Sequence, residues 1–216
     1  MTEKEDIKDG LVEEFYRRSF FEKILGKKPK LRSKQHYKNG KQDGFSEHFN
    51  KYGQLRGRNN YKDGERDGLS EWFHENGQLG GRENYKNGKA DGLYEVFYDN
   101  GQLSYKQNYK NGQQEGLHEV FDENGQLLYK NNYKNGENHG LWETFHKNGQ
   151  LSERLNCKNG QREGLHESFH ENGQLLFKHN YKNGRKNGLW EYFDEDGKLT
   201  KTEEYNNGKL IHDQET

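Results

Sequence analysis

The sequence of 216 residues is poor in cysteine, proline and apolar residues. Its one cysteine, Cys157, excludes a disulfide framework within the chain and a zinc site built from cysteines. Only 27% of the residues are hydrophobic, too few to fill the core of a conventional two-layer domain of this length. No apolar run approaches the roughly 20 residues of a membrane-spanning helix. The chain must therefore fold with little interior, which repeat architectures do.

The chain also lacks an excess of charge of either sign. Lysine and arginine number 35 and aspartate and glutamate 36, so nothing in the total charge favours nucleic acid as a partner. The first residues, MTEKEDIKDG, are charged and lack the apolar core of a signal peptide. We therefore expect a cytoplasmic location and no nucleic-acid partner.

A period of 24 residues runs through the sequence. Each unit reads approximately Y-K-N-G-x-x-x-G-L-x-E-x-F-x-x-N-G-Q-L, followed by five variable residues. The tyrosine recurs from Tyr37 to Tyr205, and Cys157 replaces it once. We predict a single repeat domain over residues 1–216. Its parts are an N-terminal capping repeat (1–36, with an insert at 16–30), seven full repeats (37–204) and a partial C-terminal repeat (205–216).

Two turn signals recur in every unit. Asn39-Gly40 exemplifies one and Asn76-Gly77 the other, and alternating segments such as Leu93-x-Glu95-x-Phe97 lie between them. Asn-Gly flanked by alternating segments is typical of β-hairpins. The pattern predicts an all-β fold, an elongated single-layer antiparallel β-meander of hairpin repeats with a short helical insert near the N-terminus.

The parity of the positions predicts the faces of this sheet. A three-residue loop with a type I turn and a glycine bulge would keep Phe97 near Leu103. Leu93, Phe97, Leu103 and Tyr109 would then share one face.

The motifs Y-x-N-G-x-x-x-G-L-x-E-x-F and E-N-G-Q-L resemble those of MORN-repeat variant proteins, in particular the bacterial YwqK-type antitoxin family. The resemblance covers Tyr37 to Leu210 and extends into the N-terminal region. It implies a β-hairpin array used for binding.

The stretch from Gly10 to Leu31 interrupts the pattern. Phe15 and Leu31 match the repeat, but they lie sixteen positions apart instead of six. The inserted residues predict a short helix that ends near Gly26. We expect the helix to form a lid over the first edge strand. The alternative is a docking surface for lipid or a partner, made of Arg17, Arg18, Phe20, Phe21, Ile24 and Leu25.

The glutamate of G-L-x-E-x-F occurs in all eight copies, which predicts a structural role. A catalytic acid is needed once or as a pair, in a pocket that shifts its pKa. We expect these carboxylates to accept hydrogen bonds from neighbouring groups and form a polar ladder. The positions are Glu13, Glu47, Glu71, Glu95, Glu119, Glu143, Glu167 and Glu191.

The histidines do not predict a metal site. His146 and His170 would lie about 9.6 Å apart, two strand spacings, whereas zinc ligands surround the ion at about 2 Å. We expect no metal, no cofactor and no enzymatic activity.

Candidate binding residues form two sets, which parity predicts to lie together on the face opposite the leucines. The variable positions of the first strand are Trp72, Tyr94, His118, Trp142, His166, Trp190 and Tyr192. A basic stripe consists of Arg58, Arg82, Lys106, Lys130, Arg154 and Lys178. Tryptophan and tyrosine are favoured in interface hot spots. The alternative is a solvated face whose charges are balanced by Asp91, Glu115 and Glu163.

The leading functional hypothesis is a non-catalytic protein-binding scaffold, in its specific form an antitoxin or immunity protein that blocks a toxin sterically. One alternative is binding to an anionic membrane surface through the basic stripe and the insert. Another is glycan binding by aromatic rings beside asparagines. The sequence predicts no oligomeric state.

Overall fold

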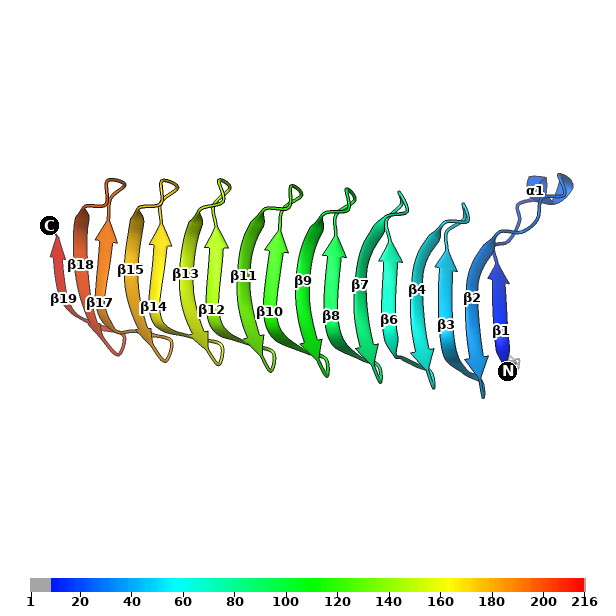
Figure 1. The fold of residues 1–216 in the computed structure, drawn as a ribbon, viewed down its shortest axis with the longest axis horizontal. Helices are drawn as coiled ribbons and strands as arrows, with labels where there is room; N and C mark the ends of the chain where they lie inside the picture. The colour runs from blue at the N-terminus through cyan, green and yellow to red at the C-terminus, as the bar shows by residue number, and fades with distance from the viewer. Residues whose placement is uncertain (1–8, 216) are drawn as a thin grey trace. The chain divides into compact units, whose positions relative to one another are not determined.

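The computed structural model describes residues 9–215, which are mostly β-strand (Figure 1). The first eight residues of the predicted N-terminal repeat, and Thr216, lie outside this description. The described residues contain nineteen strands and one short helix, α1 (Phe20–Ile24). All strand pairs are antiparallel, so the predicted all-β meander is confirmed. No helix among these residues is long and apolar enough to cross a membrane.

The chain divides into two compact units, Met1–Gln102 and Leu103–Thr216. The strands of the first unit are β1 (Gly10–Phe15), β2 (Leu31–Lys38), β3 (Lys41–Phe49), β4 (Leu55–Lys62), β5 (Glu65–Arg66), β6 (Gly68–Phe73), β7 (Leu79–Lys86) and β8 (Lys89–Phe97).

The second unit repeats the same hairpins. Its strands are β9 (Leu103–Lys110), β10 (Gln113–Phe121), β11 (Leu127–Lys134), β12 (Glu137–Phe145), β13 (Leu151–Lys158), β14 (Gln161–Phe169), β15 (Leu175–Lys182), β16 (Arg185–Lys186), β17 (Gly188–Phe193), β18 (Leu199–Asn206) and β19 (Lys209–Glu215).

The two turn signals produce two kinds of turn. Asn39 and Gly40 have φ angles of 52° and 70°, and Lys38 pairs with Lys41 across them. Positive φ at both central residues defines the two-residue type I′ hairpin turn. At the other end, Gly77 N donates to His74 O (3.0 Å) and His74 N donates to Gln78 O (2.9 Å). Gly77 has a φ of 86°, so this is the predicted three-residue loop with a glycine bulge.

A second bulge follows each three-residue loop and changes the faces of the sheet. In the β10–β11 hairpin, Leu127 lies opposite Phe121 and Tyr129 opposite Val120, so Leu128 is an extra residue. An extra residue reverses the alternation of side chains. Tyr133 therefore lies opposite Gly116, away from the leucine and phenylalanine of its hairpin. The prediction that the recurrent tyrosine shares their face is wrong, because parity counting missed this bulge.

The sheet in each unit thus has two distinct faces. We call the face with the leucine, glutamate and phenylalanine of G-L-x-E-x-F, and with the basic residues opposite the glutamate, the ladder face. The aromatic face holds the recurrent tyrosine, the two variable residues of that motif and their cross-strand partners. Nearly all buried side chains lie on the aromatic face, namely Ser33, Ser46, Ser70, Gln107, His118, Asn131, Leu155, His166, His179 and Trp190. The interior of the protein is thus a layer of polar and aromatic side chains on that face.

Candidate binding surfaces

The ladder face carries alternating acidic and basic side chains. Arg154 lies opposite Glu143 within one hairpin and opposite Glu167 in the next pair of strands. Arg154 forms its ion pair with Glu167, and Lys130 forms one with Glu143 at 2.8 Å. The hydrogen bond that the Arg154 guanidinium donates to the Glu167 carboxylate raises the pKa of Arg154. This arrangement confirms the predicted polar ladder of glutamates.

The predicted basic stripe is paired throughout, because each of its members forms an ion pair with a ladder glutamate. The pairs are Arg58–Glu71, Arg82–Glu95 (2.5 Å), Lys106–Glu119 (3.8 Å), Lys130–Glu143, Arg154–Glu167 and Lys178–Glu191 (3.9 Å). Its placement beside the variable aromatic residues is wrong, since the extra residue at the bulge sets the two groups on opposite faces.

Two of the carboxylates expected to balance the stripe have another role. Glu115 accepts a hydrogen bond from the backbone N–H of Asn135 (2.9 Å), and Glu163 accepts one from that of Asn183 (2.7 Å). Both hold type I′ turns of the following repeat in place.

The ladder face also exposes a row of leucines. In the second unit, Leu117, Leu141 and Leu189 are 38%, 39% and 47% exposed, and Leu165 is half-buried. Successive members lie two strands apart, about 9.6 Å. A shallow pocket of about 260 Å³ is lined by Leu141 and Leu165 together with ladder residues such as Arg154. The sequence analysis placed the candidate binding residues on the face opposite the leucines, so it did not select the leucines as a binding surface.

Three of the seven predicted recognition residues on the aromatic face are buried. His118, His166 and Trp190 are 5%, 4% and 4% exposed. The Trp190 ring stacks on His179 with centroids 3.7 Å apart, and its Nε1 donates to Asn180 O (3.0 Å). The prediction of these three as surface contacts is wrong, because neighbouring strands bring large side chains over them.

Two buried histidines of this face, His179 and His118, lie in an environment that is unfavourable for charge. Burial, reinforced by His166 and Lys186, lowers the pKa of His179 to about 4. Burial also lowers the pKa of His118, whose Nδ1 lies 2.7 Å from Asn131 Oδ1. These rings are therefore neutral packing groups near pH 7.

The other four predicted residues of this face are half-buried: Trp72, Tyr94, Trp142 and Tyr192. Each contacts a neighbour. Trp72 and Tyr94 lie 5.9 Å apart, Trp142 stacks on Tyr129 at 6.2 Å, and the Tyr192 hydroxyl donates to Glu203 (2.9 Å). Their roles in partner binding remain predictions.

The N-terminal insert forms the predicted helix at the tip of the β1–β2 hairpin (Figure 1). Ser19 caps it, with Ser19 Oγ accepting from Glu22 N and Glu22 Oε2 accepting from Ser19 N. No residue of α1 is buried. The apolar side chains are largely exposed: Phe20 72%, Phe21 74%, Ile24 65% and Leu25 68%. The predicted lid is therefore wrong for the described structure, because the helix sits at the hairpin tip without covering strand β1.

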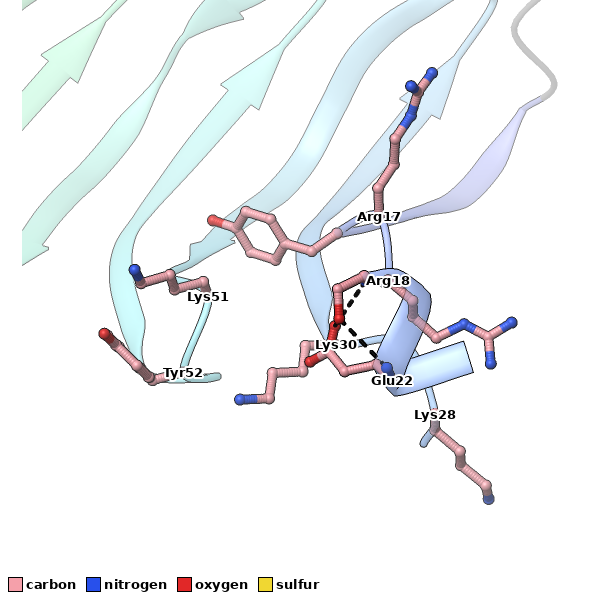
Figure 2. A pocket seen from close by; sticks show the side chains of 9 residues that line it. Arg17, Arg18, Glu22, Lys28, Lys30, Lys51 and Tyr52 are labelled. Carbon is pink, nitrogen blue, oxygen red and sulfur yellow. Dashed lines mark hydrogen bonds between the residues drawn. The ribbon is translucent and has the colours of Figure 1, made fainter. Parts of the chain in front are cut away.

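A basic pocket of about 600 Å³ lies beside this helix (Figure 2). Its lining residues are Tyr16, Arg17, Arg18, Ser19, Glu22, Lys28, Lys30, Lys51 and Tyr52. The Tyr16 hydroxyl donates to Phe49 O (2.8 Å) and Arg18 donates to Lys27 O (3.0 Å), which fixes the insert against itself and the next hairpin. The sequence pointed to Arg17 and Arg18 but not to Lys51 and Tyr52, which come from the neighbouring loop.

Metal ligands and reactive groups are sparse in the part of the chain that the structure describes. No group of three or more His, Cys, Asp or Glu residues there could hold a metal ion. Burial raises the pKa of the Cys157 thiol, which makes it less reactive as a nucleophile. Repetition of the glutamate is explained by the ion-pair ladder.

A comparison with known protein families identifies the family to which these hairpin repeats belong. The family described as MORN repeat variant matches residues 66–87, 90–111, 114–135, 138–159, 162–183 and 186–211. The chain belongs to this family. MORN repeats are in general non-enzymatic scaffolds that bind proteins or membranes. No curated protein matches the chain. The matched segments begin at residue 66, so the insert and its pocket lie outside them.

Proposed function

We propose that this MORN-repeat chain is a non-catalytic scaffold that binds a protein partner on its ladder face. The observation that carries the proposal is the row of exposed leucines Leu117, Leu141 and Leu189, set between paired charges. Exposed apolar groups surrounded by polar groups that already have hydrogen-bond or ion-pair partners are typical of protein interfaces.

The pairing of charges favours a protein over a membrane at this face. A membrane surface attracts unpaired lysines and arginines, whereas Arg154 and Lys130 are already paired with ladder glutamates. The pairs also lie at fixed positions beside the leucines, so they can select a partner by charge pattern. Glycan stacking has less support, because rings such as Trp190 and His179 already stack on each other.

In its specific form, the proposal follows the resemblance to YwqK-type antitoxins. The partner would be a toxin in the cytoplasm, and the bound sheet would cover its active surface. The resemblance of the repeat motifs is the support for this form.

Affinity capture tests the proposal. The tagged full-length chain is expressed in its native cells, and co-purifying proteins are identified by mass spectrometry. The wild type is compared with the ladder-face variant Leu117→Ser/Leu141→Ser/Leu189→Ser. A matched control, Phe20→Ser/Phe21→Ser, removes exposed apolar groups elsewhere. We expect one stoichiometric protein with the wild type and control, and its loss with the ladder-face variant. Equal recovery with all three would overturn the assignment of this face.

The antitoxin form has a separate test. The captured protein is expressed alone and together with the chain, and growth is measured. Growth arrest that the wild-type chain relieves and the ladder-face variant does not relieve is the expected result. A captured protein that is harmless alone would refute the antitoxin form and leave the scaffold proposal intact.

A further inference from the structure

Within residues 9–215, the apolar side chains of the insert at residues 16–30 are left largely exposed. Phe20 and Phe21 are 72% and 74% exposed, and their rings lie edge to face with centroids 5.9 Å apart. Ile24 and Leu25 are 65% and 68% exposed. Three such residues in a helix that buries none of its side chains, with a fourth at its C-cap, form an apolar patch that is unusual on a protein surface.

Cationic side chains lie on the segments next to the helix that carries this patch. Arg17, Arg18, Lys28, Lys30 and Lys51 line the adjoining pocket, where Glu22 is the one acidic lining residue. The Glu22 carboxylate is already engaged by Ser19 N and Oγ in the helix cap. In the described residues, none of these five cations lies within ion-pair distance of a carboxylate. The contrast with the ladder face is direct, because every basic residue of the stripe has an acidic partner there.

The cations do not converge on one point. Figure 2 shows Arg17, Arg18 and Lys28 pointing in different directions from the hairpin tip. A site for one small anion needs donors aimed at a common centre, whereas an extended anionic surface can be reached by long side chains that diverge.

We propose that this insert docks on an anionic phospholipid membrane surface. Phe20, Phe21, Ile24 and Leu25 enter the boundary between headgroups and acyl chains, and the arginines and lysines lie among the headgroup phosphates. An apolar helix face flanked by lysine and arginine is the pattern of interfacial anchors. Charge complementarity selects the membrane as occupant, because exposed aromatic groups on the helix lie beside unpaired positive charge on the segments that flank it and on the neighbouring loop. The site is distinct from the ladder face, so a scaffold bound to a protein could also be held at a membrane.

The shortness of the helix limits the strength of membrane docking. Five residues bury little apolar area, so docking is reversible and depends on both apolar insertion and charge. High salt and loss of either group should each release the protein.

Sedimentation with lipid vesicles tests the proposal on the full-length chain. The vesicles contain phosphatidylcholine with phosphatidylglycerol, or phosphatidylcholine alone, at low and high salt. The variants are Phe20→Ser/Phe21→Ser and Arg17→Gln/Arg18→Gln/Lys30→Gln. The control is Leu117→Ser/Leu141→Ser/Leu189→Ser, an equivalent apolar change on the ladder face. All the substituted side chains except the control leucines lie in the insert, outside the sheet. Thermal unfolding of each variant checks that the sheet is retained.

We expect the wild type and the control to sediment with anionic vesicles at low salt, and both insert variants to bind at least about tenfold more weakly. High salt should weaken the wild type similarly. Failure of the wild type to bind anionic vesicles at low salt would overturn the proposal. So would equal binding by Phe20→Ser/Phe21→Ser, which would mean attraction by charge without docking of the helix. Capture of an acidic protein through these residues, without vesicle binding, would overturn it in favour of a protein partner.

Discussion

The indole ring of Trp72 occupies the space above the backbone of Gly81, the residue directly opposite it in the β6–β7 pair. A Cβ atom at position 81 would overlap the ring. On its other side Trp72 faces Gly57, so the ring lies between two residues that have no side chain. At the position of Gly81, the next repeats have Tyr105 and Tyr129. The large side chain of Trp72 therefore compensates for two small neighbours.

This relationship predicts that Gly81→Ala destabilises the protein. Because Gly81 has no positive φ, the effect is steric and comes from displacing the Trp72 ring. We expect a loss of about 1–3 kcal/mol in the free energy of unfolding, measured by urea denaturation. Gly57→Ala is the matched control, since its Cβ would meet only the backbone oxygen of Glu71, at 3.3 Å, and should cost less. Equal effects of the two substitutions would show that displacement of the Trp72 ring is not the cause.

The burial of Trp190 predicts that it stabilises the fold. Trp190→Ala should cost about 3–5 kcal/mol in urea denaturation, because the ring is 4% exposed and stacks on His179. Trp142→Ala should cost less, because Trp142 is half-buried. If Trp190→Ala left stability unchanged, the aromatic face would be a binding surface and not the interior of the protein.

The ion-pair ladder predicts a measurable coupling between Arg154 and Glu167. In a double-mutant cycle of Arg154→Ala and Glu167→Ala, we expect about 0.5–1 kcal/mol of coupling at low salt. The Glu167 side chain is only 11% exposed, so we expect a larger coupling energy than for most surface ion pairs. The Arg154 side chain is 47% exposed, so dissolved salt screens part of the interaction. The control cycle of Lys34 and Glu13, a pair 3.7 Å apart whose side chains are 39% and 40% exposed, should give a smaller value. A coupling energy of zero in the first cycle would show that this ion pair does not contribute to the stability of the fold.

The histidine at position 179 predicts a loss of stability in mild acid. Its pKa in the folded protein is about 4, whereas that of an unfolded histidine is about 6.5. Protonation therefore favours the unfolded chain, and the free energy of unfolding should fall as pH decreases from about 6.5 towards 4, by no more than about 1.4 kcal/mol per pH unit. Burial of the ring is the main cause, and Glu203 opposes it while His166, Lys186 and Arg162 reinforce it.

Urea denaturation between about pH 5 and 7 measures this dependence before most carboxylates protonate. His179→Phe keeps a ring between Phe177 and Trp190 and should reduce the pH dependence, leaving the smaller part that His118 contributes. His212→Phe, at an exposed position of β19, should leave it unchanged. Identical slopes for the wild type and His179→Phe would refute the prediction.

The sequence was sufficient to predict the hairpins, because their determinants are local. Asn39-Gly40 adopts the positive φ angles that its residue types favour, and the loop at Gly77 has the predicted bulge. The ladder glutamates were also assigned a structural role correctly, since an ion-pair network needs the same acid in every repeat.

The division of residues between the faces was not predictable in the same way. The second bulge places its extra residue at Gly80 in one hairpin and at Leu128 in another, two residue types with nothing in common. Parity counting therefore put the basic stripe beside the variable aromatic residues. Once the bulge is included, Arg154 lies with Glu167 and the buried His166 lies on the opposite face.

The insert shows a second limit of sequence reasoning. The spacing of Phe20, Phe21, Ile24 and Leu25 predicted a helix, which the structure contains as α1. The same spacing suits a helix packed on strand β1 and a helix exposed at the tip. Only tertiary structure distinguishes these arrangements, and here the helix is exposed.

We propose that a protein partner binds on the ladder face, with its exposed leucines and paired charges. The most direct measurement is calorimetric titration of the purified captured partner into the full-length chain, its ladder-face variant Leu117→Ser/Leu141→Ser/Leu189→Ser, and Phe20→Ser/Phe21→Ser. We expect the ladder-face variant to bind at least about tenfold more weakly, a loss of about 1.4 kcal/mol or more, and Phe20→Ser/Phe21→Ser to bind like the wild type. Unchanged affinity in the ladder-face variant would contradict the claim.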